Sequence, residues 1–264
     1  MKQADESVVA ARTSAGMHAS AMVVGALGVI GRYIVERLVQ EDWRVIGVSR
    51  RSEPDRPRYR HLTVDLLDVA DVQRKLAPLG DITHVFYAAF QAPPGEAADF
   101  ARHIAPNRDM LANAVKAIAE TSTGLQRVVL VTGTKYYGVH LGPVKTPMRE
   151  ADPRHMPPNY YFDQIDWLTA LQKGKTWDCV ELRPQTLCGF SPGAAMSILP
   201  AIAVYAAISK ELGLPLRFPG HARAYETIYQ VTESTHFAGA ALWAATEPRC
   251  SNQAFNITNG DYFR

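Results

Sequence analysis

Short apolar runs alternate with amphipathic stretches along the first 190 residues of the chain. The first run, residues 21–24, ends at a glycine, and apolar side chains then recur at helical spacing over residues 29–38. A second run, residues 45–48, follows at the distance of a strand–helix–strand unit. The same alternation predicts strands at residues 61–64, 84–87, 127–131 and 179–182, and helices near 69–79, 99–121 and 162–173. It is typical of an α/β, Rossmann-type fold with a doubly wound parallel sheet.

Beyond residue 190 the alternation gives way to longer apolar segments. Residues 196–212 and 231–245 have the pattern of apolar helices, and residues 254–257 that of a short late strand. Proline ends or kinks a helix, and this region contains Pro192, Pro200, Pro215 and Pro219. We therefore expect residues 21–190 to form a nucleotide-binding Rossmann domain, to which residues 191–264 add a small substrate-side region.

Composition and charge fit one globular domain. The chain has 264 residues, of which 47% are hydrophobic, and this is enough for one sizeable core. Its 28 basic and 26 acidic residues give a net charge of +2, so charge indicates neither a nucleic-acid nor a membrane partner. Residues 1–20 are polar and lack the apolar core of a signal peptide or spanning helix, so we expect a disordered tail there.

The cysteines and histidines indicate neither disulfides nor a metal. Three cysteines are too few and too scattered for a disulfide framework, which favours a cytoplasmic protein. No group of histidines or cysteines has the spacing of metal ligands, so we expect no metal site. The cysteines are Cys179, Cys188 and Cys250.

A glycine-rich loop between the first predicted strand and helix has the features of a dinucleotide-binding site. Gly25, Gly28 and Gly31 let the backbone approach a pyrophosphate at a helix N-terminus, where N–H groups and the helix dipole favour an anion. A glycine turn that only lets the helix pack on the strand is the alternative, but the position after the first strand favours a cofactor. Asp65 and Leu66, which close the third predicted strand, are placed to contact adenine.

Two arginines follow the second predicted strand, where a protein specific for NAD would carry an acidic residue. Ser49, Arg50 and Arg51 occupy this position, and guanidinium groups there suit the 2′-phosphate of NADPH. The alternative is an ordinary solvated basic turn, because three more arginines lie within residues 56–60. The position at the strand end favours NADPH.

Lys135 and Tyr161 are candidate catalytic residues. Lys135 follows the predicted strand at 127–131 and Tyr161 begins the next helical pattern, so both belong to the sheet edge where α/β folds bind ligands. Tyrosine has an ordinary pKa of about 10, so it donates better to a developing oxyanion beside an ammonium group. The usual reductase spacing, Tyr with Lys four residues later, is absent from the sequence. The alternative is a loop lysine beside half-buried aromatic residues.

Several further motifs occur in a specific order. They are Thr83-His84-Val85-Phe86-Tyr87, Thr132-Gly133-Thr134-Lys135, Asn159-Tyr160-Tyr161-Phe162-Asp163, Arg183-Pro184, Gly189-Phe190-Ser191-Pro192, Val204-Tyr205-Ala206-Ala207 and Phe255-Asn256-Ile257-Thr258-Asn259-Gly260-Asp261. In this order and spacing, the sequence from residue 21 onward resembles the progesterone 5β-reductase/iridoid synthase-like enzymes, which are extended atypical short-chain dehydrogenases/reductases.

The resemblance implies hydride transfer from NADPH to the β-carbon of an activated C=C bond, typically of an enone or enal. It implies that Tyr161 and Lys135 stabilise the enolate oxygen. With the residues above, the expected cofactor contacts are Gly25, Leu27, Gly28, Val29, Ile30, Gly31, Ser49, Arg50, Arg51, Asp65, Leu66, Ala89, Val131, Thr132, Leu187, Ala194, Ala195 and Met196. The expected substrate-lining residues are Phe90, Tyr137 and Phe190.

The sequence departs from the family pattern at four places. The family's Asn-Phe-Tyr-Tyr is Asn-Tyr-Tyr-Phe at residues 159–162, which keeps the proposed catalytic tyrosine. Its Arg-Pro-Gly-Asn is Arg-Pro-Gln-Thr at residues 183–186, which changes the loop expected at the nicotinamide. The insertion at 137–157 looks more like microbial members than plant ones. Family members also continue into a C-terminal helical region, so we expect a truncated substrate side.

Three functions follow from these observations. The first is NADPH-dependent 1,4-reduction of small enones or enals. The second is 1,2-reduction of a carbonyl by the same Tyr and Lys, or epimerase-type chemistry on a sugar nucleotide. The third is a non-catalytic NADP(H)-binding sensor. Each implies a small-molecule ligand, and a homodimer is a further expectation.

Overall fold

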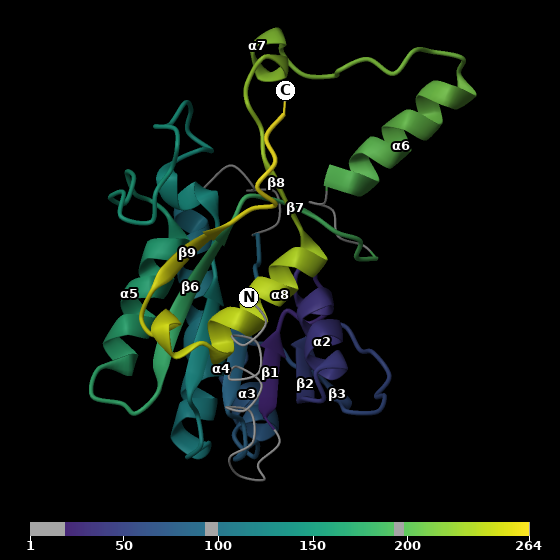
Figure 1. The fold of residues 1–264 in the computed structure, drawn as a ribbon. Helices are drawn as coiled ribbons and strands as arrows, with labels where there is room; N and C mark the ends of the chain where they lie inside the picture. The colour runs from purple at the N-terminus through teal and green to yellow at the C-terminus, as the bar shows by residue number, and fades with distance from the viewer. Residues whose placement is uncertain (1–18, 93–99, 193–197, 264) are drawn as a thin grey trace, which may run out of the picture.

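A seven-stranded parallel sheet forms the centre of the computed structural model, which describes residues 19–92, 100–192 and 198–263 (Figure 1). In chain order its strands are β1 (Ser20–Val24), β2 (Arg44–Ser49), β3 (Tyr59–Thr63), β4 (His84–Tyr87), β5 (Arg127–Val131), β6 (Asp178–Pro184) and β9 (Ala254–Ile257). They lie in the order β3-β2-β1-β4-β5-β6-β9, and neighbouring strands are parallel. The predicted doubly wound Rossmann-type fold is therefore confirmed.

The strand order reverses between β1 and β4. From β1 the chain builds outward through β2 and β3, then returns to place β4 on the other side of β1. In open α/β sheets, ligands bind at the carboxyl ends of the strands beside such a reversal. The fold alone therefore indicates where a cofactor would bind.

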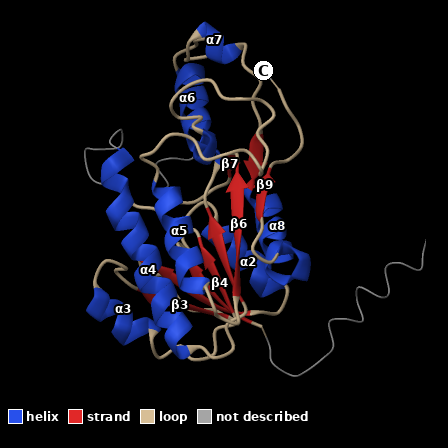
Figure 2. Cartoon of the chain, turned by 90° about the vertical axis from the view of Figure 1, so that its left-hand side faces the viewer, coloured by secondary structure: helices blue, strands red, loops and turns tan. Residues whose placement is uncertain are grey.

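Helices cover both faces of the sheet (Figure 2). Helices α2 (Gly31–Gln40) and α8 (Ser234–Thr246) pack on one face, and α3 (Val69–Leu76), α4 (Ile104–Thr121) and α5 (Tyr160–Gln172) pack on the other. Neighbouring residues of β1 point into different layers, as the alternation of a strand requires. Val23 packs in one core with Ile34 and Phe237, whereas Met22 packs in the other with Leu111.

The remaining elements lie mainly beyond the carboxyl edge of the sheet. A second, two-stranded parallel sheet joins β7 (Thr186–Cys188) to β8 (Val231–Glu233). Helix α6 (Ile198–Glu211) extends away from the sheet, and a long loop leads from its far end to α7 (Ala222–Tyr225) (Figure 1). Single 3-10 turns are η1 (Phe100–His103), η2 (Thr134–Tyr137) and η3 (Pro248–Cys250).

Several boundaries differ from those predicted. Residues 231–233 are not helical: they form β8, and the helix begins at Ser234 because the Glu233 carboxylate accepts hydrogen bonds from the Thr235 and His236 N–H groups. Strand β3 begins at Tyr59, before the predicted residue 61. Strand β1 begins at Ser20, inside the predicted tail, and residues 1–18 lie outside the described residues.

Within the described ranges, every helix is too short or too polar to cross a membrane. The homodimer and the cytoplasmic location stay predictions. The division into a domain at 21–190 and a substrate-side region at 191–264 also stays a prediction.

Candidate functional site

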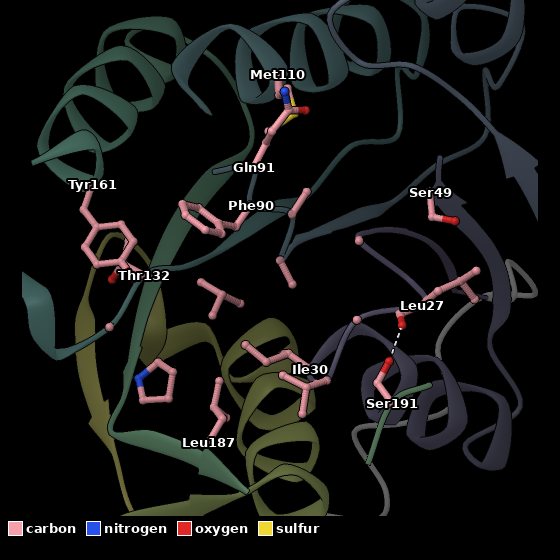
Figure 3. Close-up of a pocket in the computed structure, with 18 of the residues that line it drawn as sticks. Leu27, Ile30, Ser49, Phe90, Gln91, Met110, Thr132, Tyr161, Leu187 and Ser191 are labelled. Atoms are coloured by element: carbon pink, nitrogen blue, oxygen red, sulfur yellow. Dashed lines mark hydrogen bonds between the residues drawn. The ribbon is translucent and has the colours of Figure 1, made fainter. Parts of the chain in front are cut away.

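A cavity of about 940 Å³ lies along the carboxyl edge of the sheet (Figure 3). The loop after β1, the ends of β2, β4, β5 and β6, and strand β7 contribute to its wall. The predicted site residues that line it are Gly25, Leu27, Gly28, Val29, Ile30, Ser49, Arg50, Arg51, Leu66, Ala89, Phe90, Val131, Thr132, Lys135, Tyr161 and Leu187. Gly31, Asp65, Tyr137 and Phe190 are not among the lining residues. Ala194, Ala195 and Met196 lie outside the described residues.

The glycine-rich loop forms a tight cradle at the start of α2. Gly25 has a φ of 85°, and a Cβ there would lie 2.8 Å from the Ala88 carbonyl oxygen. A Cβ on Gly31 would lie 2.1 Å from the Gly25 carbonyl oxygen, so the helix can approach the loop only with glycine at this position. No side chain caps the N-terminus of α2 at Ile30. The loop thus leaves backbone N–H groups of the first helical turn for an anion.

Arg50 and Arg51 differ from two of the neighbouring arginines, Arg56 and Arg58. Arg56 pairs with Glu36 at 2.8 Å and Arg58 with Asp42 at 3.2 Å. Neither Arg50 nor Arg51 has an ion pair within the described part of the chain. Their guanidinium groups donate instead to neutral oxygens, the Gln91 side chain and the Pro192 carbonyl, each at 3.1 Å. Two guanidinium groups at the end of β2 would suit a phosphate.

Ser49 and Leu66 lie at the same end of the cleft, whereas Asp65 does not face it. The Ser49 hydroxyl donates to the Arg51 carbonyl oxygen at 2.7 Å, and Leu66 is buried in the cleft wall. The exposed Asp65 carboxylate accepts a hydrogen bond from the Leu67 N–H at 3.0 Å. Neighbouring residues of an extended segment point in opposite directions, so only Leu66 of the predicted pair reaches the cleft.

Asn159 connects the two candidate catalytic segments. It is the N-cap of α5, and its side-chain oxygen accepts a hydrogen bond from the Tyr161 N–H at 3.1 Å. Its side-chain N–H donates to the Lys135 carbonyl oxygen at 2.8 Å. Asn159 is buried, so both hydrogen bonds are shielded from water. The start of α5 is thereby fixed to the turn that follows β5.

Tyr161 is buried in the cleft wall near the end of β5. Burial raises the pKa of its hydroxyl, the charge of Glu181 raises it further, and a hydrogen bond with Tyr160 opposes both effects. A Cβ on Gly133 would lie 3.2 Å from the Tyr161 hydroxyl, so the glycine leaves room beside this group. Figure 3 shows Tyr161 beside Thr132 at one end of the cleft and Ser49 at the other. The hydroxyl is a protonated donor at neutral pH.

Lys135 places an ammonium group in the same cleft. Its side chain is partly buried, and burial lowers the pKa of its ammonium. The Nζ atom lies 5.3 Å from the centre of the Phe100 ring, an attractive cation–π geometry. The described residues supply no carboxylate that pairs with it.

Aromatic residues form the wall on the Tyr161 side. Phe90 stacks on Tyr160 with ring centres 5.3 Å apart and an angle of 28°, and both line the cleft. The predicted substrate contact Tyr137 instead points away: its hydroxyl donates to Asn256 at 2.7 Å and accepts from Arg183 at 2.9 Å. Phe190 is 62% exposed and does not line the cleft. Only Phe90 of the three predicted residues reaches it.

Several residues that line the cleft were not among those predicted from the sequence. Thr134 lies inside the motif that contains Lys135, and Gln185 lies at one of the departures from the family pattern, so both carried a signal. Met110 comes from the middle of α4, where nothing in the sequence marks it. Ser191 donates to the Leu27 carbonyl oxygen at 2.6 Å and so ties the segment after β7 to the glycine-rich loop (Figure 3).

The sequence matches a known domain and several known proteins. Residues 62–262 match the PRISE-like Rossmann-fold domain. The (S)-8-oxocitronellyl enol synthase of Nepeta cataria is 35% identical over 261 residues, which cover 92% of this chain and 66% of that protein. The 3-oxo-Delta(4,5)-steroid 5-beta-reductase of Arabidopsis thaliana is also 35% identical, over 92% of this chain and 66% of that protein. The chain thus spans slightly less than two thirds of the length of these relatives.

Solved structures share the fold at lower sequence identity. The UDP-glucose 4-epimerase of Thermus thermophilus in complex with NAD superposes with a TM-score of 0.68 and 20% identity, over 92% of this chain and 79% of the epimerase. Identity at this level supports the extended Rossmann-type architecture and carries no argument about the reaction.

Proposed function

The chain belongs to the PRISE-like Rossmann-fold family, and from this premise we propose that it is an NADPH-dependent reductase of activated C=C bonds. The proposed substrates are small enones or enals, reduced by 1,4-addition. The observation that carries the proposal is the meeting of Tyr161 and Lys135 in one cleft with the glycine-rich loop, Arg50 and Arg51.

The described residues fit a dinucleotide with a 2′-phosphate. Arg50 and Arg51 would hold that phosphate, and the cradle formed by Gly25 and Gly31 at the N-terminus of α2 would hold the pyrophosphate. Leu187 belongs to the apolar wall on the Tyr161 side, where the nicotinamide would lie. When bound, NADPH supplies the hydride for the reduction.

Tyr161 and Lys135 act on the carbonyl oxygen of the substrate. As the β-carbon gains hydride, the electrons of the C=C bond move toward this oxygen and an enolate develops. The Tyr161 hydroxyl donates a hydrogen bond to the oxygen, and the positive charge of Lys135 stabilises the growing negative charge. Phe90 and Tyr160 provide an apolar wall for the carbon skeleton. Transfer of a proton from water to the α-carbon of the enolate then gives the saturated ketone or aldehyde.

Two alternatives use the same cleft differently. A 1,2-reductase would reduce the carbonyl carbon itself, and Tyr161 and Lys135 suit that reaction as well. The stacked pair of Phe90 and Tyr160 favours an apolar substrate over a sugar nucleotide. A sensor that only binds NADP(H) has no need for Tyr161 and Lys135 in one cleft.

NADPH oxidation with a panel of acceptors tests the proposal. The panel contains methyl vinyl ketone, cyclohexenone and an α,β-unsaturated aldehyde, with cyclohexanone as the matched saturated control. We expect oxidation of NADPH with at least one unsaturated acceptor and none with cyclohexanone. Oxidation with cyclohexanone at a comparable rate would favour the 1,2-reductase, and no oxidation with any acceptor would reject both reductases.

Turnover is expected to fall as the pH rises through the pKa of Lys135. Burial lowers this pKa from its ordinary value of 10.5, so the charge is lost at a lower pH than for an exposed lysine. Burial raises the pKa of the Tyr161 hydroxyl, which moves its ionisation to higher pH. The measurement is kcat against pH at saturating NADPH and enone. In Lys135→Arg the guanidinium stays protonated, so the decline should move to higher pH; an unchanged profile would assign it to another group.

A further inference from the structure

Gln185 lies in the cleft, and the proposed mechanism leaves it without a role. It is the single residue between β6 and β7, and it stands where the family resemblance gives glycine. Its backbone N–H donates to the Thr232 hydroxyl at 3.1 Å and to the Ile257 carbonyl at 3.3 Å. Thr232 is fully buried and itself donates to Ile257 at 2.7 Å. The backbone at Gln185 is therefore held independently of its side chain.

Thr134 fixes the orientation of the Gln185 side chain. The Thr134 hydroxyl donates to the Gln185 side-chain oxygen at 2.6 Å. The Gln185 amide nitrogen has no hydrogen-bond partner within the described ranges, and the residue lines the cleft. Because the amide oxygen is already engaged, the side chain offers N–H donors to a ligand.

These donors belong to the same part of the cleft as the Tyr161 hydroxyl. A Cβ on Gly133 would lie 3.2 Å from this hydroxyl and 3.4 Å from the Pro184 carbonyl oxygen. Gly133 thus lies close to both the Tyr161 hydroxyl and the Pro184 carbonyl. The hydrogen-bonded side chains belong to the residues that follow Gly133 and Pro184, which are Thr134 and Gln185. In Figure 3, Leu187 lies on the Tyr161 side of the cleft, in line with this placement.

We propose that Gln185 is a third hydrogen-bond donor to the substrate's carbonyl oxygen, beside Tyr161 and Lys135. The inference rests on the proposed function and adds a catalytic residue to it. An amide N–H carries no charge and does not titrate, so its contribution persists at a pH where Lys135 has lost its proton. Because Thr134 holds the amide in place before the ligand arrives, little reorganisation is needed as the oxygen gains charge.

Binding of 4-nitrophenol in the presence of NADP⁺ tests this role without turnover. Its phenolate resembles an enolate, with an anionic oxygen on a planar carbon, and its visible absorption reports ionisation. We expect the wild-type protein to bind the phenolate. Gln185→Leu removes the donors at similar volume, and Gln185→Glu keeps the oxygen for Thr134 but loses the donors. Each should weaken phenolate binding by about 10- to 100-fold, the range for a lost hydrogen bond to a charged group.

Three further measurements make the result specific. NADPH affinity, from cofactor fluorescence, should stay within about twofold in both variants. If the wild type reduces cyclohexenone, kcat/KM for this substrate should fall in both Gln185 variants by about the same factor as the affinity for the phenolate. Gln126→Leu is the matched control, because Gln126 is exposed just before β5 at the opposite edge of the sheet. Its phenolate and NADPH affinities should equal those of the wild type, and melting temperatures check the fold of each variant.

The outcomes separate this inference from the proposed function. Undiminished phenolate binding in both Gln185 variants would overturn the inference, as would a wild-type protein that binds no phenolate. Loss of NADPH affinity with unchanged phenolate affinity would also overturn it, because Gln185 would then contact the cofactor. If the wild type binds phenolate through Gln185 but reduces no enone, the donor role stands and the proposed reductase function fails.

Discussion

Tyr161→Phe is expected to lower enone turnover by about 10²- to 10⁴-fold, the range for a positioned proton or hydrogen-bond donor. The change removes the donor to the developing enolate and keeps the aromatic ring, whose centre lies 4.5 Å from that of Tyr160. Packing at the start of α5 should therefore persist. Steady-state kcat with an enone and saturating NADPH measures the loss, and a cofactor titration should show NADPH affinity within about twofold of wild type.

Tyr136→Phe is the matched control for this variant. Tyr136 is buried in the same aromatic cluster but does not line the cleft. Loss of its hydroxyl should leave turnover within about threefold of wild type. Comparable turnover in Tyr161→Phe and Tyr136→Phe would contradict the account, because the enolate would then be stabilised by another group.

Replacing both Arg50 and Arg51 by alanine is expected to weaken NADPH binding by about 100-fold or more and to change NADH binding little. A hydrogen bond to a charged group contributes about 1.5–3 kcal/mol, which corresponds to about 10- to 100-fold per arginine. The 2′-phosphate is present only in NADPH, so the loss should be confined to that cofactor. Fluorescence titration of the protein with each cofactor measures both affinities.

The double variant Arg56→Ala with Arg58→Ala is the control, because it removes two charges from the same positive stretch. These arginines are paired with Glu36 and Asp42, so we expect unchanged affinity for both cofactors. If the Arg50 and Arg51 changes weakened the binding of NADPH and NADH equally, these residues would contact a part of the dinucleotide that both cofactors share. If the binding of neither cofactor were weakened, Arg50 and Arg51 would belong to an ordinary solvated turn that does not contact the cofactor.

The sheet could be predicted from sequence because its strands are short apolar runs separated by helical patterns. The pair of β7 and β8 could not. Each has three residues, too few to establish a periodicity, and they pair across more than forty residues of chain. The first turn of the predicted helix at 231–245 was wrong for the same reason: apolar content alone does not separate a short strand from the helix that follows it.

The segments that form the site could be predicted from the sequence. The direction in which each of their side chains points could not. Tyr137 lies two residues after Lys135, yet its hydroxyl turns to Asn256, 119 residues further along the chain. Such a contact is a property of the tertiary fold. The hydrogen bonds of Asn159 show the same limit. Its position before a helical pattern is typical of a helix cap, but the sequence does not indicate that its side chain also donates to the Lys135 carbonyl oxygen. The catalytic and cofactor roles of the individual residues stay predictions.

The carbon that receives a labelled hydride from NADPH distinguishes 1,4-reduction from 1,2-reduction. NADPH deuterated at its reactive nicotinamide carbon is incubated with the protein and cyclohexenone, and the product is examined by NMR. We expect cyclohexanone with deuterium at the β-carbon, and loss of this product in Tyr161→Phe. Deuterium at the carbinol carbon of cyclohexenol would contradict this expectation.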